Sequence, residues 1–467
     1  MATKAEKHAQ RSELMRTGPL GPTIIKMALP SIVSFLITSV YNLADTYFVS
    51  SLGTQATAAV SVNASLDMLI MMIGSLLGVG SGSLVARLLG AKNRQKAEEV
   101  LSTNFAIAAV FGVLLMIFGS IFSHPLVRML GATATCEHYS VQYATYVLLA
   151  APFMATSFVM NQCLRAEGSA MLSMIGMGFG GILNCFLDPL FIFKFGLGVA
   201  GASMATAISK FVSFCILIYP YLRGKSLLQL RFRSVRADFA AIGEVLSIGS
   251  SSMFRTALSV VAGIVLNKLA GAISDSVLAG IGVCTKIMMF PFGFVIGFGQ
   301  GFQPVAGFNW GAKQYDRVRE SYRIAAKIAF FGAAVMGVLV FVFARGLIGL
   351  FTQTDGEMLR IGALCLRLQS IALPIHAWVA IVNMLCVGIG KAKGATALST
   401  ARQGTCFLPI VYPMARFGGA YGIASVQAVA DVLTLALAFP IRKRMLKIID
   451  DTAAEYKLSL ESNIEEE

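Results

Sequence analysis

The stretch Gly180–Phe193, GGILNCFLDPLFIF, places a carboxylate, Asp188, in an apolar run long enough to cross a bilayer. A charged side chain at the centre of a membrane helix costs about 2.5–3.5 kcal/mol on insertion scales. Asn184 lies four residues earlier on the same helical face, and Pro189 frees a backbone carbonyl because it has no N–H to donate. Asn, Asp and a freed carbonyl together favour an oxygen-rich site for a cation or a proton.

The composition places the chain among multi-pass membrane proteins. Of its 467 residues 56% are hydrophobic and 13% charged, and the mean hydropathy is +0.73. The net charge of +14 is explained by basic residues in cytoplasmic loops, and no basic stretch is interleaved with aromatics, so no nucleic-acid partner is expected. The eight cysteines show no C-x-x-C spacing and the four histidines are far apart, so no metal site is predicted from them.

Twelve apolar segments of about twenty residues or more predict an all-α membrane protein with twelve transmembrane helices. Basic residues are concentrated in alternate connections between these segments, so the positive-inside rule predicts that both termini are cytoplasmic. We therefore expect a multi-pass protein of the plasma or inner membrane. The segments fall roughly at 24–50, 57–86, 100–122, 140–162, 171–194, 197–222, 241–271, 277–306, 322–346, 360–387, 395–417 and 419–441.

The two halves of the chain repeat. Leu89–Lys92, LGAK, recurs as Trp310–Lys313, WGAK, and Gly198–Gly201 recurs as Gly419–Gly422. In both pairs the second copy follows the first by the same number of residues, which we call the repeat offset. Because an even number of spans separates the copies, the repeats are parallel. The repeat predicts two six-helix bundles related by a pseudo-two-fold axis along the membrane normal.

Four regions are expected along the chain. An N-terminal six-helix lobe occupies 1–222 and a C-terminal six-helix lobe 241–446, with a basic cytoplasmic linker at 223–240 between them. A charged cytoplasmic tail follows at 447–467. The density of Lys and Arg in the linker forbids its insertion into the membrane.

The central acids are not repeated. At the repeat offset Asp45 aligns with Leu266, and Asp188 aligns with Pro409. Both carboxylates therefore belong to the first lobe alone, which indicates that this lobe is specialised.

Several stretches taken in order resemble the multidrug and toxic compound extrusion (MATE) family, in particular its DinF-like branch with MepA-type exporters. They are ADTYFVSSLG at 44–53, RLLGAK at 87–92 with its echo NWGAK at 309–313, and SMIGMGFGGILNCFLDPLFIF at 173–193 running into GVAGASMATAIS at 198–209. The resemblance covers nearly all twelve segments. It implies two six-helix bundles around a central cavity and cation-coupled export of amphiphilic drugs.

The resemblance also implies which residues bind the coupling ion. In the DinF-like branch a polar network within the first lobe binds this cation, and the ion is either H⁺ or Na⁺. A sodium ion would be held at Asp188, Asn184 and Asp45, and no other cofactor is implied. The positions that match the network here, all with the expected residue types, are Asp45, Tyr143, Asn161, Asn184, Asp188 and Thr206.

A tentative substrate cavity is assigned to four further residues. Asp67, a third acid in the second segment, either attracts cationic drugs or pairs with Lys286 at a roughly corresponding place in the eighth segment. Methionines are flexible enough to adapt to different ligands, and Met71 and Met288 are expected to line the cavity.

Two other sets of residues are interpreted as structural. Arg255 and Asp431, inside the seventh and twelfth segments, are expected to form an ion pair or to line the pore. Gly176, Gly180 and Gly181 are small residues of the kind that let membrane helices approach closely.

The expected function is export of bulky, often cationic, organic molecules and drugs by alternating access, by a monomer in contact with membrane lipids. The chain has no G-x-x-x-x-G-K-[ST] phosphate loop, so ATP is not expected to drive transport directly. A flippase of lipid-linked sugars is an alternative, although its cavity would be lined with Arg and Lys. A membrane-embedded enzyme is a second alternative, but no nucleophile–base pair is evident, so the chain is not expected to be an enzyme.

Overall fold

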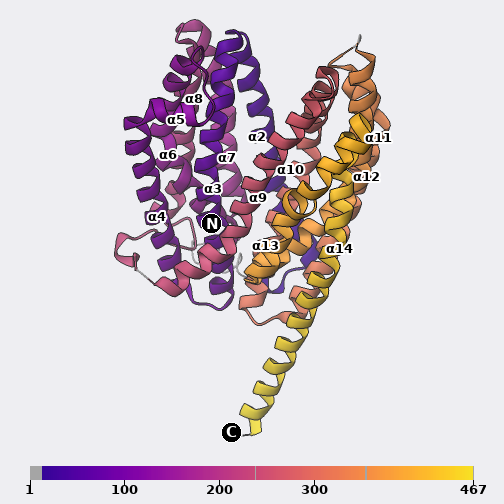
Figure 1. Cartoon of the computed structure of the whole chain (residues 1–467). Helices are drawn as coiled ribbons and strands as arrows, with labels where there is room; N and C mark the ends of the chain where they lie inside the picture. The colour runs from indigo at the N-terminus through magenta and orange to yellow at the C-terminus, as the bar shows by residue number, and fades with distance from the viewer. Residues whose placement is uncertain (1–12, 237, 353–354, 466–467) are drawn as a thin grey trace. The chain divides into compact units, whose positions relative to one another are not determined.

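A computed structural model describes residues 13–236, 238–352 and 355–465, and the regular elements in these ranges are all helices (Figure 1). Two of the elements are π-helical segments, η1 and η3, and one is a short 3₁₀ helix, η2. In chain order the elements are α2 (Leu20–Ser50), α3 (Thr54–Gly90), α4 (Arg94–Ile121), α5 (Ser123–Met129), α6 (Glu137–Ala166), α7 (Ala170–Pro189), η1 (Leu190–Lys194), α8 (Gly198–Leu222), η2 (Phe232–Ser234), α9 (Phe239–Gly271), α10 (Asp275–Gly311), α11 (Tyr315–Gly349), α12 (Gly356–Gly388), α13 (Ala392–Thr400), η3 (Ala401–Thr405) and α14 (Leu408–Glu465).

Eleven helical stretches within the described residues are long and apolar enough to cross a membrane. The last of them, Ala392–Ser462, is 71 residues long, more than twice what one crossing needs. It is divided at Gly419, where the backbone leaves the helical region with φ 52° and ψ −134°. The prediction of an all-α protein with twelve membrane segments is therefore confirmed.

The sequence repeat is confirmed in the backbone. Lys92 and Lys313, the lysines that end the two copies of the repeated loop, have φ of 60° and 58°. They are the non-glycine residues with positive φ in the described part of the chain, a conformation that is uncommon for residues with a Cβ. Gly198 and Gly419, which open the sixth and twelfth segments, also share a positive φ, of 56° and 52°. Both pairs are separated by the repeat offset, so the repeat preserves local conformation as well as sequence.

The chain forms two compact units. One consists of Met1–Leu14 and Leu29–Gly249, and the other of Met15–Ala28 and Ser250–Glu467. Each unit therefore holds most of one repeat together with the start of the first long helix of the other repeat, which is α9 for the first unit and α2 for the second. The boundaries at 222 and 241 that the linker suggests remain a prediction.

In the first unit the start of α9 packs on α3. A Cβ atom at Gly80 would overlap the carbonyl oxygen of Val245. One turn later in α9, a Cβ at Gly249 would overlap the carbonyl of Leu76. Glycine at these positions lets the two backbones touch.

In the second unit the start of α2 occupies the equivalent place on α10. A Cβ at Gly301, the repeat equivalent of Gly80, would overlap the backbone of Ala28. The Asn309 amide donates to the carbonyl oxygen of Met15 over 3.2 Å. Each unit thus contains the same close packing of a half-helix on a glycine-bearing helix.

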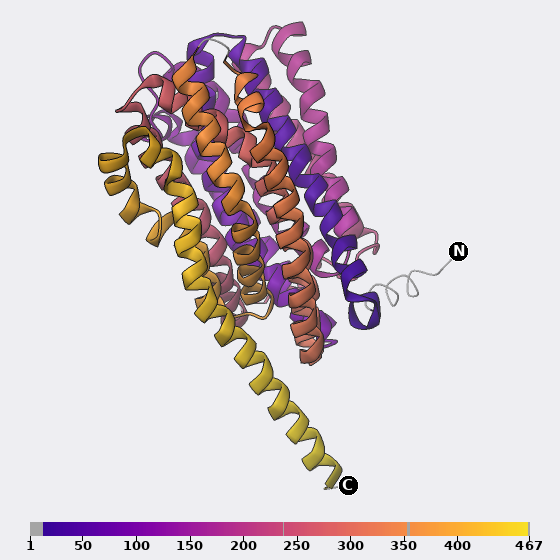
Figure 2. The same ribbon diagram turned by 90° about the vertical axis from the view of Figure 1, so that its right-hand side faces the viewer.

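The last helix continues well beyond the other helices of its unit (Figure 2). This extension still contacts other parts of its own unit. Asp450 Oδ1 lies 2.9 Å from Arg319 Nη1 of α11, and the ring centroid of Tyr456 lies 4.7 Å from Lys313 Nζ. The charged tail predicted from the sequence is helical as far as Glu465.

Candidate functional site

Polar side chains of four helices meet at one end of the first unit. The Asn184 amide on α7 donates to Asp188 Oδ1 over 3.1 Å and to Thr206 Oγ1 of α8 over 3.3 Å. The Tyr143 hydroxyl of α6 is in hydrogen-bonding contact with Thr206. Asp188 has no exposed surface. Four of the six predicted coupling residues therefore form one buried cluster, and Asp45 of α2 joins it electrostatically.

Glycines in α7 place this cluster against α8. A Cβ at Gly180 would overlap Ser213 Oγ of α8, which confirms the predicted close approach. Gly180, Asn184 and Asp188 follow one another at four-residue spacing and so share a face of the helix. The face that touches α8 through a glycine therefore carries the amide and the carboxylate one and two turns later.

The helix changes form directly after the carboxylate. Pro189 ends α7, and the next residues form the π-helical segment η1. Short π-helical segments occur often at functional sites. This geometry leaves the backbone beside Asp188 without a regular α-helical continuation.

A lysine that the sequence analysis did not single out faces the acids. Lys210 of α8 interacts electrostatically with Asp45 of α2 and Asp67 of α3. Its Nζ donates to the Tyr41 hydroxyl over 3.2 Å and lies 5.1 Å from the centroid of that ring. Lys210 follows Thr206 by four residues in an otherwise uncharged helix, and this spacing was the available signal.

Several acceptor atoms in the cluster have no hydrogen-bond partner among the described residues. They are buried oxygens from three helices, and nearly all buried polar atoms in native proteins do have a partner. A cation or a proton would satisfy such oxygens. The atoms are Asp45 Oδ1, Asp67 Oδ1, Asn184 Oδ1 and Asp188 Oδ2.

Asn161 lies in a different setting. Its amide donates to Ser173 Oγ over 2.8 Å, and its oxygen accepts from Arg165 Nη2 over 2.6 Å. In the second unit Asn383 donates in the same way to the carbonyl of Ala395, twelve residues further on. These contacts fasten the connection between the fourth and fifth segments of each repeat, so the structure does not bring Asn161 to the Asp188 cluster.

The second unit contains a buried ion pair. Arg402 of η3 donates to Asp431 of α14 through Nε over 2.6 Å and through Nη2 over 3.3 Å. Asp431 therefore pairs with Arg402. Of the two expected roles, an Arg255–Asp431 pair or pore-lining groups, the pair is corrected. Arg255 instead donates to Ser252 one turn before it in α9. The η3 segment sets Arg402 against α14, which is why sequence spacing did not reveal the partner.

The residues assigned to a substrate cavity are divided between the units. Asp67 and Met71 belong to the first unit and Lys286 and Met288 to the second. Asp67 interacts with Lys210 within its own unit. Met71 is exposed and Met288 is fully buried. The pairing of Asp67 with Lys286 and the shared cavity remain predictions.

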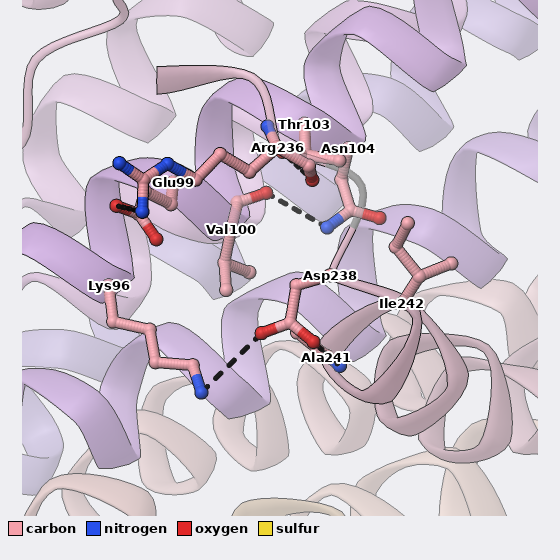
Figure 3. Close-up of a pocket in the computed structure, with 9 residues that line it drawn as sticks. All are labelled: Lys96, Glu99, Val100, Thr103, Asn104, Arg236, Asp238, Ala241 and Ile242. Carbon is pink, nitrogen blue, oxygen red and sulfur yellow. Dashed lines mark hydrogen bonds and ion pairs between the residues drawn. The ribbon is translucent and has the colours of Figure 1, made fainter.

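The predicted linker is docked on α4. Figure 3 shows a small pocket in which Lys96 lies 3.5 Å from Asp238 Oδ2 and Arg236 lies 3.6 Å from Glu99. The backbone N–H of Ala241 donates to Asp238, and together with Lys96 it lowers the pKa of that carboxyl. Asp238 caps α9, because its Oδ1 accepts hydrogen bonds from the backbone N–H groups of Ala240 and Ala241. The pocket is a structural contact, because its polar groups are paired with one another.

Comparison with known proteins gives a family match over both repeats. The family model MatE matches residues 30–190 and 252–415. The chain is 26% identical over 419 residues to the multidrug export protein MepA of Staphylococcus saprophyticus, covering 90% of this chain and 92% of the relative. It is also 26% identical over 426 residues to the MepA of Staphylococcus aureus strain MSSA476, with 91% and 93% covered.

Solved structures confirm the fold. An outward-facing multidrug resistance MATE family transporter of the MOP superfamily superposes with a TM-score of 0.88 at 24% identity, covering 94% of this chain and 98% of the other. A MATE protein in complex with MaL6 gives a TM-score of 0.89 at 24% identity, with 94% and 99% covered. At this identity the likeness shows the shared architecture.

Proposed function

The chain belongs to the MatE family of multidrug efflux transporters, and we propose that it exports bulky, often cationic organic molecules in exchange for H⁺ or Na⁺ by alternating access. Family membership makes the chain a membrane transporter and not an enzyme. The observation that supports ion coupling is the group of unpartnered buried oxygens on Asp45, Asp67, Asn184 and Asp188.

The proposed coupling follows from the cost of buried charge. Asp188 is fully buried and interacts with Asp45, another carboxylate. Two nearby carboxylates in a low-dielectric site cannot both ionise cheaply, so the empty site attracts a cation. Binding of a proton or a sodium ion removes the buried charge and allows the helix with Pro189 to change shape. The membrane potential adds about 2.3 kcal/mol per charge per 100 mV to this cycle.

The proposed transporter is a monomer among membrane lipids, with both termini in the cytoplasm. It needs no cofactor besides the coupling ion. Asp67 and Met71 contribute to the drug-binding surface. A flippase of lipid-linked sugars has less support, because the cluster holds three carboxylates against one lysine, and this excess of negative charge would repel a pyrophosphate.

The test is export of a fluorescent organic cation from liposomes that contain the purified protein, under separately imposed pH and sodium gradients. Asp188→Asn keeps the side-chain shape but cannot titrate, so it should insert and still bind drug while gradient-driven export is lost. Asp45→Asn should behave similarly but less severely. Asp451→Asn, at an exposed position of α14, is the matched control and should export normally. Gradient-driven export at the wild-type rate by Asp188→Asn would overturn the proposal.

A further inference from the structure

Lys210 is placed as a counter-charge within the acidic cluster. Its side chain is partly buried, and its ammonium donates a hydrogen bond of 3.2 Å to the Tyr41 hydroxyl and lies 5.1 Å from the centroid of the same ring. A Cβ at Gly181 of α7 would lie 3.2 Å from a ring carbon of Tyr41. Because α7 packs on one side of this ring, the ring and the lysine have little freedom to move apart.

The groups around Lys210 are mostly acidic. Asp45 and Asp67 are near enough to interact with it electrostatically, and Asp188 interacts in the same way with Asp45. With one ammonium and three carboxylates, the cluster has two negative charges when all are ionised. The titratable groups that face the cluster are Tyr41 and Asp45 from α2, Asp67 from α3, Tyr143 from α6, Cys185 and Asp188 from α7, and Lys210 itself from α8.

The ammonium supplies a positive charge near Asp45 and Asp67. A sodium ion needs several oxygen ligands at short distance, and a nearby ammonium repels it. A proton needs no coordination shell, and the unpartnered Asp188 Oδ2 offers it a place.

The second repeat has the opposite charge at this position. Asp431 is the repeat equivalent of Lys210, and its carboxylate is already paired with Arg402 over 2.6 Å. Gln427, at the position of Thr206, donates to Asp431 over 3.4 Å. Both repeats thus carry a charged residue at this position of their sixth helix, Lys210 in the first and Asp431 in the second. In the first lobe the charge is a cation surrounded by an excess of acids.

We infer that Lys210 determines ion specificity: it acts as a tethered cation that excludes Na⁺ from the Asp45–Asp67 side of the cluster and leaves Asp188 to exchange protons. This inference rests on the proposed ion-coupled export and narrows its coupling ion to H⁺. Without the ammonium, the unpartnered buried oxygens of Asp45 and Asp67 lose their neighbouring positive charge, and their negative charge then attracts a monovalent metal ion.

The experiment measures sodium sensitivity in two ways. Export into or out of liposomes is driven by a pH gradient or by a sodium gradient alone, and Asp188 is labelled with a hydrophobic carbodiimide with and without saturating Na⁺. The wild type should respond to the pH gradient only, and Na⁺ should not protect Asp188 from the label. In Lys210→Met, Na⁺ should lower the labelling about tenfold or more, the effect of one nearby opposite charge.

Two variants serve as controls. Lys210→Arg keeps the positive charge, so Na⁺ should again fail to protect Asp188 from the label. Lys194→Met removes an exposed lysine of the same lobe and should leave sodium sensitivity unchanged. Export by the wild type under a sodium gradient alone, or no sodium protection in folded Lys210→Met, would overturn the inference. A wild type that responds to sodium would overturn the inference even if Lys210→Met does not insert. The absence of any gradient-driven export by the wild type would instead refute the proposed function.

Discussion

Gly80 on α3 lies directly against the backbone carbonyl of Val245 on α9, so that a Cβ atom at position 80 would overlap the carbonyl oxygen. The neighbouring contact between Gly249 and Leu76 is equally close. Backbone atoms cannot swing away as the end of a flexible side chain can. The crossing of these two helices therefore depends on glycine.

Gly80→Leu should destabilise the protein by about 3 kcal/mol, at the upper end of the range for overpacked cores. The measurement is thermal unfolding of the purified protein in detergent. Gly243→Leu in α9 is the control, because no atom lies within 4 Å of a Cβ there and the gain in helix propensity is the same. Equal melting temperatures for the two variants would show that the α3–α9 crossing can relax.

The contact between α7 and α8 gives a second prediction. A Cβ at Gly180 would overlap Ser213 Oγ and lie 2.9 Å from the carbonyl oxygen of Ser209. Gly180→Ala should therefore push the helices apart and stretch the 3.3 Å hydrogen bond between Asn184 and Thr206. We expect gradient-driven export to fall several-fold while the protein still inserts.

A double-mutant cycle tests this steric cause. Ser213→Ala removes the overlapping hydroxyl, so the pair Gly180→Ala with Ser213→Ala should recover part of the export, with a coupling energy of about 1–2 kcal/mol. Ser213→Ala alone should export normally. An additive loss in the double variant would mean that Gly180 acts by another route.

Much of the fold was predictable because its signals are local. The length of each apolar run fixes a membrane helix, and the repeated loops ending at Lys92 and Lys313 identified the duplication. The packing of the start of α9 on α3 was not predicted. Gly80, which contacts Val245, lies in the second apolar segment, far before Val245 in the sequence, and glycines occur throughout the chain. Periodicity identifies a buried face but not the helix that covers it.

The candidate site was predictable only in part, for a similar reason. Asn184, Asp188 and Thr206 lie on consecutive segments, so their meeting follows from the topology. Lys210 was missed because its partners Tyr41 and Asp67 come from helices far away in the sequence. The contacts of Asn161 depend on a turn between two helices, whose path the sequence pattern does not give.

Glu167 should hold the linker in place. Its Oε2 accepts hydrogen bonds from the Ser226 hydroxyl over 2.6 Å and from the backbone N–H groups of Leu227 over 2.9 Å and Leu228 over 3.3 Å. Glu167→Ala removes the acceptor of the Ser226 hydroxyl and of the Leu227 N–H, whereas the Leu228 N–H keeps its 3.1 Å bond to Ser226 Oγ. The loss should cost about 2–4 kcal/mol of unfolding free energy, and hydrogen exchange should rise most at the Leu227 amide.

Glu167→Gln is the conservative control, because its amide oxygen remains an acceptor for at least one of these donors. It should lose less stability than Glu167→Ala and keep the Leu227 amide partly protected. Unchanged exchange in Glu167→Ala would show that other contacts, such as that of Arg236 with Thr103, hold the linker alone.

The ion pair of the second unit should contribute to stability and not to coupling. Arg402 is 17% exposed and Asp431 4% exposed by side chain, so Asp431→Leu leaves a nearly buried guanidinium without its acid. Removing one partner of such a pair costs about 3–5 kcal/mol, which thermal unfolding would show. The guanidinium also lies 4.6 Å from the centroid of the Phe292 ring, a contact that a methionine can replace.

The double variant Arg402→Met with Asp431→Leu separates the two roles. Without an uncompensated charge it should regain most of the stability that Asp431→Leu loses, since apolar replacement of a buried pair is often neutral. It should also keep export that responds to the imposed ion gradient, because the proposed coupling carboxylates all lie in the first lobe. A double variant that is stable and binds drug yet has lost its response to the gradient would place part of the coupling machinery at Asp431.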